Sequence, residues 1–181
     1  WLRWAEALGE ALLARFHDAA GGGFFSTEAG QEDLLRQKPG FDNALPSGNT
    51  LAARALLRLS RHLDREDFRA AAEGTLQGFG PWMQRAPRAF LGMLGVLDQI
   101  LREPLEIVVS GDPALPATRA LLAEVHRRHL PGRLVSVSWD QALPLHQGRR
   151  APEGGAVATV CRGRVCSAPV SHPEALGRLL D

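Results

Sequence analysis

The chain has little of several residue types, and each scarcity narrows what the protein can be. Of its 181 residues none is Tyr, two are Cys, and the basic residues are twenty Arg and a single Lys, Lys38. Two Cys cannot supply the four ligands of a structural zinc site, so no metal is expected. The formal net charge is only +1, which gives no electrostatic reason to expect nucleic acid as a partner.

Long apolar runs and a cleavable leader are missing as well. No apolar stretch reaches the ~18 residues that a membrane-spanning helix needs. The opening stretch WLRWAEALGEALLARF carries charges throughout and has no small-residue cleavage site. We therefore expect no membrane partner and a cytoplasmic location. Because an amphipathic pattern is already under way at Trp1, we also expect the chain to be part of a longer protein.

The first hundred residues have the apolar spacing of amphipathic helices. We expect helices over residues 1–17, 47–62 and 87–102, and another that starts at an N-cap, Asp64, and ends in the segment GFGPW (78–82). In the first helix one apolar stripe is expected to be buried. Its members are Trp1, Trp4, Ala5, Leu8, Leu12 and Phe16.

From Pro104 onward the pattern changes to strands. The runs LEIVVS (105–110) and RLVSVSW (133–139) flank a helical segment for which Asp112 is a candidate N-cap, and this order predicts a βαβ unit with parallel strands. The runs AVATVC and VCSAPV, separated by RGR, predict a β-hairpin, and Ser171 with Glu174 predicts a capping box for a helix over 172–180. The expected fold class is mainly α followed by α/β, with domains at 1–103 and 104–181.

The segment FDNALPSGNT (41–50) holds the candidate site residues, at the mouth of the second helix. Ser47 is its natural N-cap, and Asn49 falls in the first turn, where the helix dipole and backbone N–H groups favour an anion or a hydroxyl-rich ligand. Asp42 can serve as an acid, a base or an acceptor for a sugar hydroxyl, and Lys38 lies four residues before it. A structural alternative stays open, in which Ser47 caps the helix while Asp42 and Asn43 shape a turn.

The two cysteines, Cys161 and Cys166, flank the turn of the predicted hairpin. A two-residue turn at Gly163 and Arg164 places them opposite each other, with Cα atoms ~4.5 Å apart, which is within reach of a disulfide. They are therefore a candidate redox pair. The alternative is two buried thiols that pack as small apolar side chains, as is common inside cells.

Two other motifs are weaker. The segment HRRH (126–129) has no carboxylate partner motif and indicates a solvated basic face rather than a metal site. The segment VVSGDP (108–113) follows a strand and precedes a helix, but one glycine is too few for a phosphate-binding loop. Its position is nevertheless where ligand crevices form in α/β sheets.

A family resemblance joins these segments. RQKPGFDNALPSGNTLAARALLRLSR resembles the Lys…Asp…Pro-Ser-Gly-Asn-Ser segment of the YyaL-type thioredoxin-domain-containing proteins, the spermatogenesis-associated-protein-like family. VCRGRVCSAPVSHPEALGRLL resembles the closing segment of that family, and GGGFFST and EIVVSGD match in kind and order, so the resemblance covers essentially the whole chain. The chain departs from the family pattern at Asn43, where Gly is expected, and at Thr50, where Ser is expected.

The resemblance implies more than the residues do alone. Its fold would be helical hairpins of a partial α/α toroid of the six-hairpin type, like that of N-acylglucosamine epimerases, plus a small C-terminal βαβ-hairpin module. This chain would be the C-terminal portion, and a thioredoxin-like domain of the same full-length chain would be its partner. The implied site has Lys38 and Asp42 as catalytic residues and Asn43, Ser47 and Asn49 as substrate-binding residues.

Two functions from different classes follow. In the first, the chain binds a carbohydrate and isomerises or epimerises it by proton transfer, with Asp42 sharing the acid and base work with a residue outside this chain. In the second, it is a non-catalytic scaffold or redox-linked binding module, and Cys161 and Cys166 are the substrate or reporter of the thioredoxin-like domain. Neither function implies a cofactor, and whether the chain is an enzyme stays open.

Overall fold

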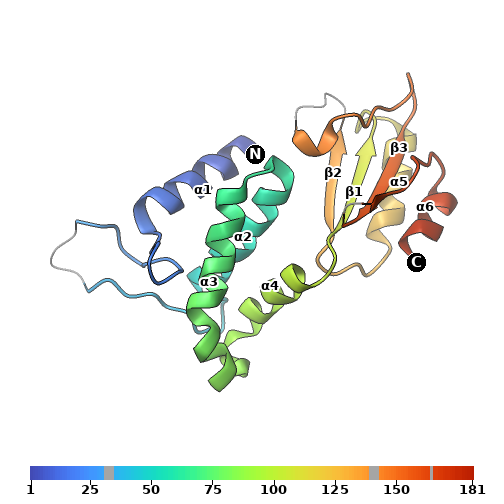
Figure 1. Cartoon of the computed structure of the whole chain (residues 1–181). Coiled ribbons are helices and arrows are strands. Elements are labelled where there is room, and N and C mark those ends of the chain that lie inside the picture. Colours follow the sequence, from blue (N-terminus) through green and yellow to red (C-terminus); the bar gives the residue numbers. More distant parts are fainter. Residues whose placement is uncertain (31–34, 139–142, 164) are drawn as a thin grey trace. The chain divides into compact units, whose positions relative to one another are not determined.

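The computed structural model describes residues 1–30, 35–138, 143–163 and 165–181 (Figure 1). The chain divides into two compact units, Trp1–Leu101 and Arg102–Asp181, and each has its own hydrophobic core. The first unit is helical and the second contains a small mixed sheet, which agrees with a mainly α segment followed by α/β. The toroid, and the division into domains at 1–103 and 104–181, stay predictions.

The first unit is built from helices that pack around buried apolar side chains. The core is centred on the helix pair α2 and α3, and its largest fully buried members are Leu56, Phe68, Phe90 and Met93. The helical segments are α1 (Leu2–Phe16), α2 (Gly48–Leu63), α3 (Glu66–Arg85), the 3-10 turn η1 (Pro87–Phe90) and α4 (Leu91–Leu101).

The expected buried face of α1 is only partly right. Trp1, Trp4 and Leu8 are exposed, whereas Leu2, Ala5, Leu12, Leu13 and Phe16 pack against the core. The physical reason is Gly9, where a Cβ atom would lie 3.0 Å from Cζ of Phe68. The close approach of Gly9 to Phe68 fixes which side of α1 faces the core. The spacing of apolar residues in the sequence does not reveal a contact made by a glycine.

The start and end of α3 also differ from expectation. Asp64 does not cap α3; it ends α2 in the left-handed conformation (φ 53°, ψ 46°), with its N–H donating to the Ser60 carbonyl. α3 then continues through Pro81 to Arg85. A proline removes one helical hydrogen bond, but Phe79 and Met83 stay buried on the same part of the helix, and their burial outweighs that loss.

The second unit is a four-stranded sheet with helices on one face. Its strand order is β2-β1-β3-β4, with β1 and β2 parallel and the other neighbours antiparallel, so the predicted βαβ unit and hairpin are confirmed. Ile107 and Val109 of β1 pack against the helical residues Leu121, Val125 and Leu176. The elements are β1 (Leu105–Ser110), α5 (Pro116–His126), β2 (Leu134–Ser138), the 3-10 turn η2 (Pro144–His146), β3 (Val157–Arg162), β4 (Val165–Cys166) and α6 (Pro173–Leu180).

The helix caps predicted in this unit are wrong. α5 begins after Leu115, and Asp112 instead shapes the preceding turn by accepting the Ala114 N–H at 2.8 Å. α6 begins after His172, without a side-chain cap from Ser171. Polar residues near a helix start are interchangeable as caps in a pattern, and the actual cap depends on where tertiary packing turns the chain.

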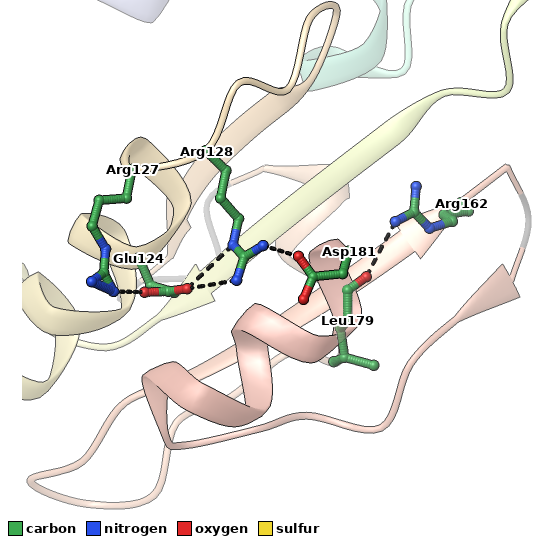
Figure 2. Close-up of polar contacts among 6 residues, drawn as sticks. All are labelled: Glu124, Arg127, Arg128, Arg162, Leu179 and Asp181. Atoms are coloured by element: carbon green, nitrogen blue, oxygen red, sulfur yellow. Dashed lines mark hydrogen bonds and ion pairs between the residues drawn. The ribbon is translucent and has the colours of Figure 1, made fainter.

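Charged side chains join the end of α5 to the end of α6 (Figure 2). Buried Glu124 accepts hydrogen bonds from Arg127 and from Arg128, whose Nη2 lies 3.1 Å from Oε1, and Arg128 also pairs with Asp181. Burial alone would raise the pKa of Glu124, but these arginine hydrogen bonds outweigh it and lower the pKa. The expected solvated basic face is confirmed for His126, Arg127 and His129, which are exposed, whereas Arg128 is partly buried between two carboxylates.

Candidate functional site

Asp42 lies where the start of α2 meets the start of α4. Its Oδ1 accepts the Ser47 N–H at 2.8 Å and the Thr50 hydroxyl at 3.0 Å, and its Oδ2 accepts the Gly92 N–H at 2.7 Å. Burial alone would raise the pKa of Asp42, but these three donors outweigh it and hold the pKa below its ordinary value. A carboxylate held in this way is ionised at neutral pH and is a weak general base.

Ser47 and Asn43 occupy the turn that leads into α2. Ser47 is its N-cap, as predicted, since its hydroxyl oxygen accepts the Thr50 N–H at 3.1 Å. Asn43 is exposed, and its N–H donates to the Leu45 carbonyl at 3.0 Å. The structure thus joins Asp42 and Ser47 directly and leaves the Asn43 side chain at the surface.

Asn49 is buried and connects α2 to two loops. Its Nδ2 donates to the carbonyls of Phe24 (3.0 Å) and Pro39 (2.9 Å), and its Oδ1 accepts the Phe24 N–H at 2.7 Å. Three of the four hydrogen bonds open to an amide side chain are therefore made inside the protein. This geometry supports a structural role for a residue that its position in the first turn made a ligand candidate.

Lys38 belongs to a separate network. Its Nζ donates to Oδ2 of Asp18 at 2.6 Å and to the Gly22 carbonyl at 3.0 Å. The Lys38 hydrogen bond and the Gly21 N–H together lower the pKa of Asp18 to about 2. Lys38 thus pairs with Asp18, twenty residues before it, and sequence spacing gave no sign of this partner.

Three hollows are formed by other residues. One of about 630 Å³ lies beside His17, Gly22 and Gly74, and an apolar one of about 310 Å³ lies between α3 and α4. A third, of about 560 Å³, lies in the second unit. Among the residues that line these three there is no candidate from the 38–49 segment.

Gly92 offers a direct test of the tight junction around Asp42. A Cβ atom there would lie 2.5 Å from Cγ2 of Thr50 and 3.0 Å from Oδ2 of Asp42, whereas a Cβ on Gly95, in the same helix, would meet open space. We expect Gly92→Ala to lower the free energy of unfolding by about 2 kcal/mol through overpacking. Gly95→Ala should raise it by roughly 0.5–1 kcal/mol, because alanine is the better helix former. Urea unfolding measures both, and similar midpoints for the two variants would contradict the tight junction.

The hairpin of the second unit carries the other candidate pair. Cys161 and Cys166 form a disulfide with Cα atoms 4.0 Å apart, and the predicted pairing across β3 and β4 is confirmed. The predicted turn residue Arg164 lies outside the described residues. Cys161 is buried and Cys166 is exposed, so only one of the two sits where a partner can reach it.

Arg149 lies against this disulfide. Its Nη2 is 3.3 Å from Sγ of Cys161 and 3.4 Å from Sγ of Cys166, and its Nη1 donates to the Leu145 carbonyl. Sequence reasoning missed Arg149, because it is brought to the hairpin by the loop before β3. A cation beside sulfur stabilises a thiolate relative to a thiol.

The described part of the chain contains neither a cluster of metal-ligating side chains nor a membrane-spanning helix. Among these residues no cluster of three or more His, Cys, Asp or Glu could hold a metal ion. No helix of residues 1–30, 35–138, 143–163 and 165–181 is both long and apolar enough to cross a membrane.

The chain is similar in sequence to several known proteins. No family model matches it. It is 32% identical over 189 residues to spermatogenesis-associated protein 20 of Homo sapiens and of Mus musculus, an alignment that covers 99% of this chain. The matches are consistent with the spermatogenesis-associated-protein-20-like family. An uncharacterized protein of Caenorhabditis elegans is 27% identical over 166 residues.

The similarity to spermatogenesis-associated protein 20 is partial in one respect. The chain spans about a quarter (24%) of the length of that relative. The name states neither a substrate nor a reaction. The thioredoxin-like domain, the toroid and a carbohydrate ligand therefore stay predictions of the resemblance.

Proposed function

We propose that this chain is a redox-linked binding module whose Cys161–Cys166 disulfide exchanges with the dithiol of a thioredoxin-like partner. The observation that carries the proposal is the Arg149 guanidinium, which lies within 3.4 Å of both sulfur atoms of a disulfide that has one exposed cysteine. The partner follows from the resemblance, which implies a thioredoxin-like domain in the same full-length protein.

The exchange proceeds in two steps that balance. A thiolate of the partner attacks Sγ of exposed Cys166 and forms a mixed disulfide, and Cys161 leaves as a thiolate beside Arg149. The partner's second thiolate then attacks the partner's first sulfur, which is bonded to Cys166 in the mixed disulfide. This step releases Cys166 as a thiolate. The partner is oxidised to a disulfide, and the chain is reduced and takes up two protons. Arg149 lowers the barrier because it stabilises the negative charge on the leaving sulfur.

The size of the disulfide loop also supports an exchange role. The two cysteines are five residues apart in sequence, and closing so short a loop stabilises a fold by only about 2 kcal/mol. The unit already has a buried core of its own. The crosslink is therefore a weak structural staple, and its opening would leave most of the stabilising contacts in place.

Carbohydrate isomerisation has less support from the geometry. Asp42 would need a free oxygen and a raised pKa to serve as a general base or acid at neutral pH, and its oxygens instead accept three internal hydrogen bonds. Asn49 would need a free amide to hold a sugar hydroxyl, and its amide is bound to Phe24 and Pro39. We therefore favour the redox-linked module.

The test is the rate of disulfide reduction, followed by thiol counting after mixing with dithiothreitol and, separately, with a reduced thioredoxin. We expect Arg149→Gln to slow reduction roughly tenfold, because the leaving thiol has a higher pKa without the guanidinium. Arg149→Lys should recover part of the rate, since it keeps a positive charge. Arg178→Gln removes an exposed arginine of α6 and serves as the charge-matched control. Equal rates for Arg149→Gln and Arg178→Gln would overturn the role of Arg149, and a wild-type disulfide that resists both reductants would overturn the proposal.

A further inference from the structure

A polar cavity of about 560 Å³ opens at the carboxyl ends of the parallel strands β1 and β2. Its wall is formed by the loop after β1, the last residue of β2 and the segment before β3. In α/β sheets this edge is the usual place for a ligand, and the segment VVSGDP, too weak as a motif to assign, ends here. The lining residues are Gly111, Asp112, Leu115, Ser138, Arg149, Arg150, Ala151, Pro152, Gly154 and Gly155.

The first feature of this cavity is the start of α5, an eleven-residue helix. Its N-cap residue is Leu115, which lines the cavity and cannot accept a hydrogen bond through its side chain. The first-turn N–H groups of a helix need an acceptor and carry the positive end of the helix dipole. An oxyanion in the cavity would lie near the positive end of this dipole, although Pro116, the first helical residue, contributes no N–H.

The second feature is independent of the helix. Ser138 lines the cavity and is only 2% exposed, yet its hydroxyl has no hydrogen-bond partner within the described part of the chain. The neighbouring serines on the same face are satisfied: Ser110 donates to the Arg149 carbonyl at 2.9 Å, and Ser136 lies 2.7 Å from Nε2 of His146. Proteins rarely keep a buried hydroxyl without a partner, and this one points to a bound molecule.

Gly111 brings backbone close to the same place. Its φ is +148°, and a Cβ atom there would lie 2.7 Å from the Thr118 hydroxyl and 2.9 Å from Cβ of Ala156. Only glycine fits, so the backbone itself forms this part of the wall. Thr118, in the first turn of α5, is fully buried, and its hydroxyl also has no partner among the described residues.

The charges on the wall favour an anion. Arg149 and Arg150 contribute two positive charges and Asp112 one negative charge, and an oxygen of Asp112 already accepts the Ala114 N–H. We infer that the cavity binds a small oxyanion of the phosphate class, held by the Ser138 hydroxyl beside the N-terminal end of α5. The site shares Arg149 with the disulfide exchange proposed above, but oxyanion binding through Ser138 does not depend on that exchange.

The experiment titrates inorganic phosphate, and in a second arm glycerol phosphate, into the purified protein by calorimetry, with chloride holding the ionic strength constant. We expect saturable binding that Ser138→Ala weakens about tenfold, the loss of one good hydrogen bond. Because that hydroxyl has no partner among the residues that the structure describes, Ser138→Ala should not lower the thermal midpoint. Tighter binding of glycerol phosphate would indicate a phosphate monoester as the natural ligand, and tighter binding of inorganic phosphate the free ion.

Ser136→Ala is the matched control, two residues earlier on β2. It removes a hydroxyl that contacts His146, so it should lower the thermal midpoint and leave phosphate affinity unchanged. Ser138→Ala is thus expected to lower phosphate affinity without lowering the thermal midpoint. Ser136→Ala is expected to lower the thermal midpoint without lowering phosphate affinity. Absence of saturable binding in both arms, or equal affinities of the Ser136→Ala and Ser138→Ala variants, would overturn the inference.

Discussion

Replacing Asn49 by alanine is expected to lower the free energy of unfolding by about 3 kcal/mol, because three buried hydrogen bonds disappear together and their backbone partners stay buried. The partners are the N–H and carbonyl of Phe24 and the carbonyl of Pro39. Asn49 therefore connects both loops to the first turn of α2, and alanine has no amide to make these hydrogen bonds. Urea or thermal unfolding monitored by circular dichroism measures the loss.

Asn43→Ala is the control for this prediction. Asn43 lies in the same segment, but its side chain is exposed, so its removal should change the free energy of unfolding by less than about 0.5 kcal/mol. A carbohydrate-binding role for Asn49 predicts another outcome, since a side chain kept for a ligand can be removed without unfolding the protein. A stable Asn49→Ala variant would therefore revive the ligand hypothesis and contradict the structural one.

The strands and helices were largely predictable from the sequence, and the reason is periodicity. The runs that became β1 and β2 are short, apolar and β-branched, and the helical segment between them has the length of a crossover connection, so the βαβ unit followed. The Ser47 cap was predictable because the serine, the turn before it and the apolar stripe after it all agree. Predictions from local sequence signals are most reliable where several such signals agree with one another.

Predictions failed where a long-range contact decided the outcome. The buried face of α1 depends on the contact between Gly9 and Phe68, and the length of α3 depends on the burial of Phe79 and Met83 beyond what Pro81 costs. Neither contact can be recognised from the spacing of apolar residues in the neighbouring sequence. A pattern therefore identifies a helix more readily than it identifies the helix face that is buried.

The candidate site shows the same division. Asp42 and Ser47 lie five residues apart, and the bond between them could be anticipated from turn chemistry. Gly92, the other main partner of Asp42, lies fifty residues away, and Arg149 reaches the cysteines from a loop before their hairpin. These partners decide whether Asp42 is a general base or a structural carboxylate, and whether the cysteines are reactive. The sequence alone therefore left carbohydrate isomerisation and the redox-linked module both open.

Asp42→Asn should lower the free energy of unfolding by about 2–3 kcal/mol at pH 7, because hydrogen bonds to a charged acceptor are lost and an amide N–H₂ faces a backbone N–H. The folded-state pKa of Asp42 lies below its ordinary value. Its carboxylate therefore stabilises the protein above about pH 4, and that contribution is lost as the pH falls through the lower, folded-state pKa. The difference between wild type and variant should shrink accordingly in acid.

Asp64→Asn is the matched control, because Asp64 is exposed and left-handed (φ 53°), a conformation that asparagine tolerates well. The unfolding midpoint of Asp64→Asn should stay close to that of the wild type both at pH 7 and in acid. The hypothesis of a catalytic Asp42 predicts a different pattern: an Asp42→Asn variant as stable as wild type at pH 7 but without turnover. Because stability and turnover are measured separately, one pair of unfolding curves decides whether the three donors around Asp42 hold the start of α2 against α4 or leave the carboxylate available for chemistry.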